Sequence, residues 1–146
     1  MVDTNIEGIL NSYKYIIKDI RAIDIEIDVI ENEYKGCGAL SYEEKTGETY
    51  KISSSVETEI VLKEKKIEYL LYLKRSKELK IKKIENLVSN LTEKEYYIIS
   101  SYYFRGIKNS IIADHLEMNE KYLISKRKGI IKKLESEISK YDYIKF

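Results

Sequence analysis

Proline and tryptophan are absent from this chain of 146 residues, and cysteine and histidine occur once each. Because proline is the strongest helix breaker, its absence leaves long uninterrupted helices possible. A single cysteine, Cys37, excludes an internal disulfide framework. With His115 as the one histidine, the chain cannot supply a zinc site of the usual ligand types. We therefore expect neither a metal nor a cofactor.

Long apolar runs and an excess of one charge are also missing. No stretch approaches 18 uninterrupted apolar residues, so we expect no membrane contact, and the first residues lack the pattern of a signal peptide. Lys+Arg 26 against Asp+Glu 25 gives a net charge of +1, which favours no particular partner. The 43% of hydrophobic residues suffices for a folded core. The expected location is the cytoplasm.

Sequence patterns of catalysis are equally scarce. The isolated glycines are not followed by the Gly-Lys-Ser/Thr of a phosphate loop. Cys37 has no base nearby in the sequence, and paired carboxylates such as Glu43 and Glu44 lie on faces expected to be solvated. We expect a structural or phosphate-contacting role for His115 and conclude that the chain is not an enzyme.

Residues 3–35 carry the most regular pattern. Isoleucine and tyrosine recur there at alternating steps of three and four residues: Ile6, Ile9, Tyr13, Ile16, Ile20, Ile23, Ile27, Ile30 and Tyr34. This heptad seam predicts a helix of roughly 50 Å that must pack against another helix. The tyrosines at such positions, like most of the fourteen in the chain, are expected in the core.

Residues 36–53, with three glycines, interrupt this pattern and predict either a loop or a small β-hairpin turning near Gly47. Helical periodicity resumes at Ser54, where Ser54 and Glu57 fit a capping box. Residues 1–35 have a net charge of −4 and residues 63–83 a net charge of +6. An antiparallel hairpin would place these opposite charges together, although the basic run of residues 63–83 could instead contact phosphates.

Residues 91–138 show a different organisation. Thr92 and Glu95 fit a second capping box, and the helix they begin ends near Gly106. A short apolar segment around Ala113 follows, then a break at residues 117–119, and Asn119 is a good N-cap for the last helix. Ala113 is expected at a helix crossing and Leu123 in the core.

A short helix, a tight turn and a longer basic helix form a helix-turn-helix pattern. Residues 119–146 have a local net charge of +4, as expected of a helix that enters the major groove. Lysines would mainly contact phosphates, whereas Tyr122, Ser125 and Lys126 are candidates for base edges. The predicted DNA-binding residues are Lys121, Tyr122, Ser125, Lys126, Lys128 and Lys132.

These residues also carry a resemblance. Leu91-Thr-Glu-Lys-Glu-Tyr-Tyr-Ile-Ile99, Tyr103-Phe-Arg-Gly106-Ile107, Ile112-Ala113, Leu116, Met118-Asn119, Leu123 and Leu134 together resemble region 4 of bacterial sigma factors. Two positions depart from that pattern: Gly129 stands where the family usually has a basic residue, and Arg127 where it usually has an apolar one. The overall plan resembles phage late-gene transcription regulators of the ArpU and RinA type.

The sequence thus predicts an all-α protein with two domains. Residues 1–90 would form a long antiparallel coiled-coil hairpin, a region for self-association into a homo-oligomer, and residues 91–146 a helix-turn-helix domain that binds double-stranded DNA. The resemblance implies a phage or prophage activator of late genes that contacts host RNA polymerase. Two alternatives stay open, namely a small terminase-like DNA-packaging subunit and a coiled-coil adaptor or anti-sigma-like protein that binds protein only.

Overall fold

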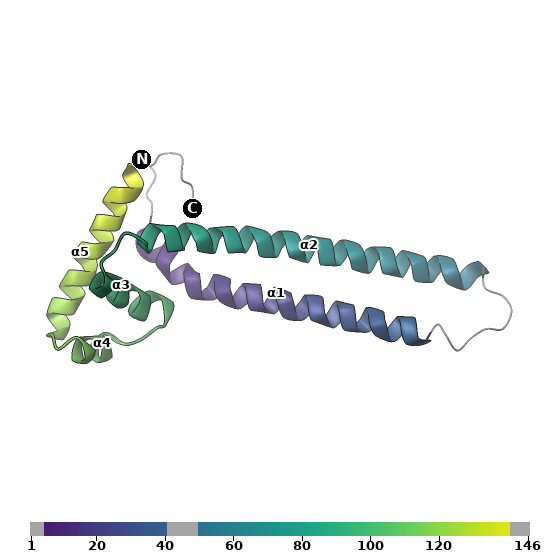
Figure 1. The fold of residues 1–146 in the computed structure, drawn as a ribbon, viewed down its shortest axis with the longest axis horizontal. Helices are drawn as coiled ribbons and strands as arrows, with labels where there is room; N and C mark the ends of the chain where they lie inside the picture. Colours follow the sequence, from purple (N-terminus) through teal and green to yellow (C-terminus); the bar gives the residue numbers. More distant parts are fainter. Residues whose placement is uncertain (1–4, 41–49, 141–146) are drawn as a thin grey trace. The chain divides into compact units, whose positions relative to one another are not determined.

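The protein is all-helical. The computed structural model describes the backbone of residues 5–40 and 50–140, and the side chains of residues 5–33 and 56–140. Two long helices, α1 (Ile6–Leu40) and α2 (Tyr50–Val88), pack together as a hairpin (Figure 1). Shorter elements follow and form a small bundle: α3 (Glu93–Ile99), the π-helix η1 (Ser100–Phe104), α4 (Asn109–His115) and α5 (Glu120–Ser139). The predicted fold class is confirmed.

Contacts divide the chain into two compact units. Residues 19–78 form one unit, which contains most of the two long helices. Residues 1–18 and 79–146 form the other, so the start of α1 and the end of α2 belong with α3, α4 and α5. This division differs from the predicted boundary at residue 90, because apolar residues at both helix ends take part in the core of the C-terminal bundle.

The unit of residues 19–78 is held by the predicted seam. Ile23, Ile27 and Ile30 are buried on α1, as the heptad spacing requires. The acidic helix also pairs with the basic one, through Glu26 with Lys66, Asp24 with Lys74, and Asp19 with Lys77, at 3.5, 2.6 and 3.1 Å between Oε1 or Oδ and Nζ. Residue numbers fall on α1 as they rise on α2, so the helices are antiparallel. Exposed pairs of this kind contribute little stability, but they favour one register.

The two long helices extend further into residues 36–53 than the sequence pattern predicted. The α1 helix continues through Gly36 and Gly38 to Leu40, and α2 already begins at Tyr50. Ser54 therefore lies inside α2 and is no N-cap, so the capping box predicted at Ser54 is wrong. A mid-helix glycine costs only about 1 kcal/mol relative to alanine, which a long packed helix tolerates. The β-hairpin turn predicted near Gly47 lies outside the described residues.

The second unit has one continuous apolar core. Buried side chains come from the start of α1, the end of α2 and all of the shorter elements: Ile6, Leu10, Ile84, Leu87, Val88, Ile98, Ile99, Tyr103, Ile112, Ala113, Leu123, Ile130, Ile131 and Leu134. The Tyr13 ring of α1 stacks on Phe104 of η1, with 4.0 Å between ring centroids. The first turns of α1 are therefore part of the framework that supports α4 and α5.

Candidate nucleic-acid interface

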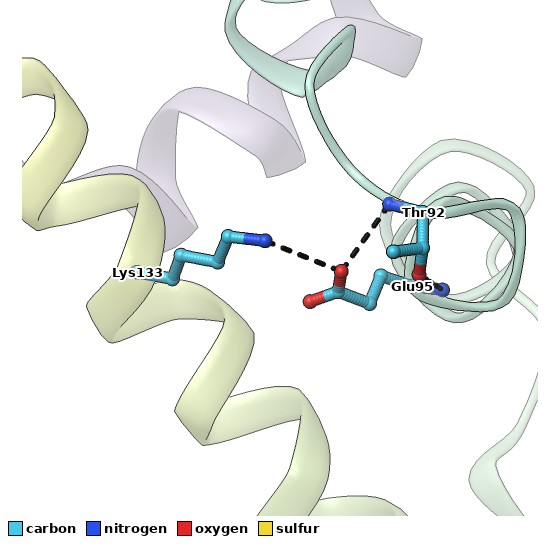
Figure 2. Close-up of polar contacts among 3 residues, drawn as sticks. All are labelled: Thr92, Glu95 and Lys133. Atoms are coloured by element: carbon cyan, nitrogen blue, oxygen red, sulfur yellow. Dashed lines mark hydrogen bonds and ion pairs between the residues drawn. The ribbon is translucent and has the colours of Figure 1, made fainter.

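The bundle begins at the predicted capping box of α3. Thr92 Oγ1 accepts a hydrogen bond from the Glu95 backbone N–H at 3.3 Å, and the Thr92 N–H donates to Glu95 Oε1 at 3.2 Å (Figure 2). The same carboxylate oxygen accepts from Lys133 Nζ of α5 at 3.3 Å. Partial burial alone would raise the pKa of Glu95, but the hydrogen bonds with Thr92 and Lys133 outweigh it and lower that pKa. One ionised side chain thus caps α3 and joins it to α5.

The α3 helix passes directly into the π-helix η1, which the sequence pattern did not predict. The Arg105 N–H donates to the Ser100 carbonyl at 3.0 Å and the Ile107 N–H to that of Ser101 at 2.9 Å. Gly106, with φ +69°, ends this wide turn in a conformation that favours glycine. Such turns are often found at functional sites. Here the π-helix presents Tyr102 and Tyr103 toward the other elements of the bundle.

A hydrogen bond to the first turn of α1 holds Tyr103 in place. Its hydroxyl donates to Glu7 Oε1 of α1 at 3.0 Å. Burial, followed by the hydrogen bond and the negative charge of Glu7, raises the pKa of Tyr103 well above its ordinary value. The phenol therefore stays protonated and acts as a hydrogen-bond donor that ties α1 to η1.

The turn between α4 and α5 spans residues 116–119, the length typical of a helix-turn-helix. The Met118 N–H donates to the Ala113 carbonyl at 3.0 Å and the Glu117 N–H to that of Asp114 at 3.2 Å. This is the hydrogen-bond pattern of a Schellman motif, with Glu117 at the left-handed position, φ +54°. Asn119 Oδ1 then accepts from the Lys121 N–H at 2.9 Å. The predicted N-cap of α5 is confirmed.

The packing of α5 also agrees with the sequence. Leu123, Ile130 and Leu134 are buried, and Ala113 is buried on α4, as expected of a small residue at a helix crossing. Met118 packs against the core from the turn. These contacts fix which face of α5 is turned inward and leave the opposite face exposed.

Arg127 is the unexpected member of the inner face. It is 8% exposed, its guanidinium carbon lies 3.7 Å from the Tyr102 ring centroid, and Nη1 donates to Asn109 Oδ1 of α4. A guanidinium stacked on an aromatic face can occupy a buried position that is otherwise apolar. This buried position of α5 is thus occupied by an arginine that joins α4, η1 and α5.

Five of the six predicted DNA-binding residues are exposed on α5, and the sixth lies at the edge of that face. Ser125 and Lys132 lie opposite the buried side chains, flanked by Lys121, Tyr122 and Lys128. Lys126 is half-buried beside the core. The structure therefore brings the predicted residues onto one helix face. We name the face formed by Lys121, Tyr122, Ser125, Lys128 and Lys132 the outer face of α5.

One glycine on this face and two exposed cations between η1 and α4 add to what the sequence predicted. A Cβ atom at Gly129 would meet nothing within 4 Å, so this position is an open gap on the outer face. Arg105 and Lys108 are exposed between η1 and α4. They were not among the predicted residues, and the only sequence signal was that two cations flank the glycine corner at residue 106.

A hollow of about 340 Å³ lies in the same unit, between the first turns of α1 and the segment from Tyr102 to Lys108. Glu7 lines it and already accepts the Tyr103 hydrogen bond, while Lys14 and Lys108 add positive charge. His115 lies elsewhere, exposed, with its ring stacked 5.1 Å from that of Tyr97. Within the described part of the chain, no group of three potential metal ligands gathers.

Comparisons with known proteins do not place the chain in a family: no family model matches it, and neither does a curated protein or a solved structure. Across the described ranges, no helix has the length and apolar character needed to cross a membrane.

Proposed function

We propose that this protein is a sequence-specific DNA-binding transcription regulator that reads the major groove with α5. The observation that carries the proposal is the outer face of α5, which is basic, exposed and preceded by a four-residue turn after α4. A helix held in this way by a shorter supporting helix is the usual reader of the major groove. The core contacts of Leu123 and Ile130 hold α5 in place without using its outer face.

The side chains of that face suit two kinds of contact. Lys121, Lys128 and Lys132 carry charge suited to phosphates, and Ser125 and Tyr122 can donate to or accept from base edges. Lys126, at the edge of the face, can reach a base or a flanking phosphate with its long side chain. The resemblance to sigma region 4 supports a role at promoters, and the resemblance to the ArpU and RinA type supports activation of phage late genes by contact with host RNA polymerase.

The basic segment of α2 contributes less to this proposal. Lys66, Lys74 and Lys77 form ion pairs with carboxylates of α1, which favours hairpin pairing over phosphate contact for these three lysines. We therefore assign sequence recognition to α5.

The experiment uses the full chain and a duplex of about 30 base pairs that the chain selects from a random pool. We expect Lys132→Ala to weaken binding to all duplexes alike and to lower the slope of log K against log salt by about one unit. Lys126→Ala should cost about 1–3 kcal/mol at the selected duplex and reduce the preference for it, if this side chain reads a base. Lys18→Ala, an exposed lysine of α1, is the matched control and should leave both quantities unchanged.

Leu123→Ala distinguishes a loss of DNA binding caused by lower stability from one caused by removal of a DNA contact. This side chain is fully buried, so its truncation should lower thermal stability together with DNA binding. If the chain selects no duplex, or if affinity is indifferent to both Lys126 and Lys132, the proposal fails and the protein-only adaptor becomes the better interpretation.

A further inference from the structure

Four large apolar side chains of α2 are exposed although they recur at coiled-coil spacing. Leu62, Tyr69, Tyr72 and Leu79 are 61, 60, 71 and 45% exposed. Steps of seven, three and seven residues keep them on one heptad stripe, in which Lys65 and Ser76 fill the two remaining positions. Tyr69 and Tyr72 are exposed, as are Tyr15, Tyr96 and Tyr122, so the expectation that most tyrosines lie in the core is wrong for the described part of the chain. Isolated exposed apolar residues are normal, but a heptad stripe is the geometry with which one helix packs on another.

This stripe, which we name the α2 outer stripe, does not lie against α1. The half-buried residues Ile60, Ile67 and Leu70 form the seam of α2, together with Lys74 and Lys77, which pair with α1. Each residue of the outer stripe follows a seam residue by two positions, which turns it roughly 200° around the helix axis. The α1 helix therefore cannot cover the outer stripe.

The outer stripe is symmetric about its own centre. Leu62 and Leu79 lie equally far from the midpoint between residues 70 and 71, and so do Tyr69 and Tyr72. When a second α2 is laid antiparallel across a two-fold axis at this point, Leu62 meets Leu79 of the second copy and Tyr69 meets Tyr72. In an isologous interface the same surface serves both partners, and this sequence is self-complementary in that sense.

Charge beside the stripe agrees with the same register. Glu68 and Arg75 are exposed on one flank of the stripe, each one residue before a stripe position. In the antiparallel arrangement Glu68 lies close to Arg75 of the second copy, and the symmetry produces this contact twice. A parallel arrangement would instead set this flank against the opposite flank of the second helix, so Glu68 and Arg75 would not meet.

We propose that the α2 outer stripe is a homodimer interface in which two copies of α2 pair antiparallel, with the two-fold axis between residues 70 and 71. The stripe covers about 27 Å of helix, which is short for a standard interface of about 800 Å² per partner. We therefore expect a dissociation constant on the order of 10 μM. This proposal goes beyond DNA binding and stands whether or not α5 binds DNA.

Sedimentation equilibrium of the full chain between about 5 and 500 μM tests the interface. Tyr69→Glu should raise the dissociation constant at least about tenfold, since the residue lies at the centre of the contact. Leu71→Glu is the matched control on the same helix, because Leu71 is 49% exposed but outside the stripe, and its dimer should match the wild type. A chain that is monomeric throughout this range, or a dimer that Tyr69→Glu leaves intact, overturns the proposal. A dimer weakened by Ile25→Glu on α1 instead would place the contact on that helix and also overturn it.

Charge reversal tests the register without removing apolar surface. Glu68→Arg alone and Arg75→Glu alone should each weaken the dimer, because each places like charges together across the axis. The double variant should restore it. Failure of the double variant to restore dimerisation overturns the antiparallel register.

Cross-linking decides the orientation directly. With Cys37→Ser as background, a Leu62→Cys chain and a Leu79→Cys chain are oxidised separately and as an equal mixture. The proposal expects disulfide-linked dimers in the mixture and few in either sample alone, because Leu62 meets Leu79 of the other copy. Linked dimers in the separate samples, with no increase in the mixture, would show parallel pairing and overturn the proposal.

Discussion

Arg127 shows how one residue can meet a requirement that is usually met by an apolar side chain. Its guanidinium carbon lies 3.7 Å from the Tyr102 ring centroid, and its Nη1 donates to Asn109, so it fills space and satisfies an amide oxygen of α4. Its Nε is buried and has no hydrogen-bond partner among the described residues, and the same holds for the hydroxyl of Ser101 in η1. Lysine has neither the planar head nor the forked donors for this position, so an arginine-to-lysine change here would not be conservative.

Glu117 is a second residue whose conformation is set by its surroundings. It has φ +54° at the end of α4, a position at which helices usually carry glycine. The left-handed conformation costs a residue with a Cβ atom roughly 1–2 kcal/mol. We therefore expect Glu117→Gly to raise the free energy of unfolding by about 1 kcal/mol, measured by urea denaturation.

Glu135→Gly is the control for that change. Glu135 is exposed in the interior of α5, where the backbone is right-handed, so glycine should lower stability there by about 1 kcal/mol. Opposite signs for the two substitutions would confirm that the turn stores strain at Glu117. A loss of stability at both positions would contradict it.

At the scale of elements, the cap of α3 depends on one ionised side chain. Because the pKa of Glu95 is lowered in the folded protein, its carboxylate stabilises the fold at pH values above its unfolded pKa of about 4.3. This contribution is lost as the pH falls through the folded pKa, when protonation weakens the contact with Lys133 and the bond from Thr92. We expect urea denaturation midpoints of the wild type to fall between pH 6 and pH 3.

Glu95→Gln isolates this contribution from the other carboxylates of the chain. Glutamine can still accept the Thr92 N–H bond but carries no charge for Lys133. The variant should therefore be less stable than the wild type at pH 6 and lose less stability on acidification. Equal pH dependence in both proteins would show that Glu95 makes no titrating contribution.

The elements that could be predicted are those whose causes are local. The seam of α1 follows from the spacing of its isoleucines, the start of α3 from Thr92 and Glu95, and the start of α5 from Asn119. The continuation of α1 through Gly36 and Gly38 could not be predicted in this way. Glycine lowers helix propensity, but a long helix already held by its seam can overcome that local cost.

The candidate site likewise has a part that could be predicted from the sequence and a part that could not. The outward positions of Lys121, Tyr122, Ser125, Lys128 and Lys132 follow from the period of α5, once Leu123 and Leu134 are assigned to the core. The burial of Arg127 did not follow, because it depends on an aromatic ring in η1 and an amide in α4. The π-helix itself has no simple sequence signature, and it is what brings Tyr102 and Tyr103 to their partners.

At the scale of the whole molecule, the core beneath α5 is assembled from both ends of the described chain. Ile6 and Leu10 of α1 and Ile84 and Val88 of α2 are buried in the same cluster as Leu123 and Leu134. A helix-turn-helix of residues 91–138 alone would expose the inner faces of α3 and α5 that these side chains cover. The long helices therefore serve the proposed recognition helix as packing partners.

The last prediction tests this shared core. Leu10 is fully buried although it lies more than eighty residues before α3. Leu10→Ala should lower the free energy of unfolding by about 2–5 kcal/mol and speed amide hydrogen exchange in α3 and α5, because it opens a cavity in their common core. Leu71→Ala, at an exposed leucine of α2, should change stability by less than about 0.5 kcal/mol. If exchange in α3 and α5 were unchanged in Leu10→Ala, the start of α1 would be a separate layer, and the bundle would not need it.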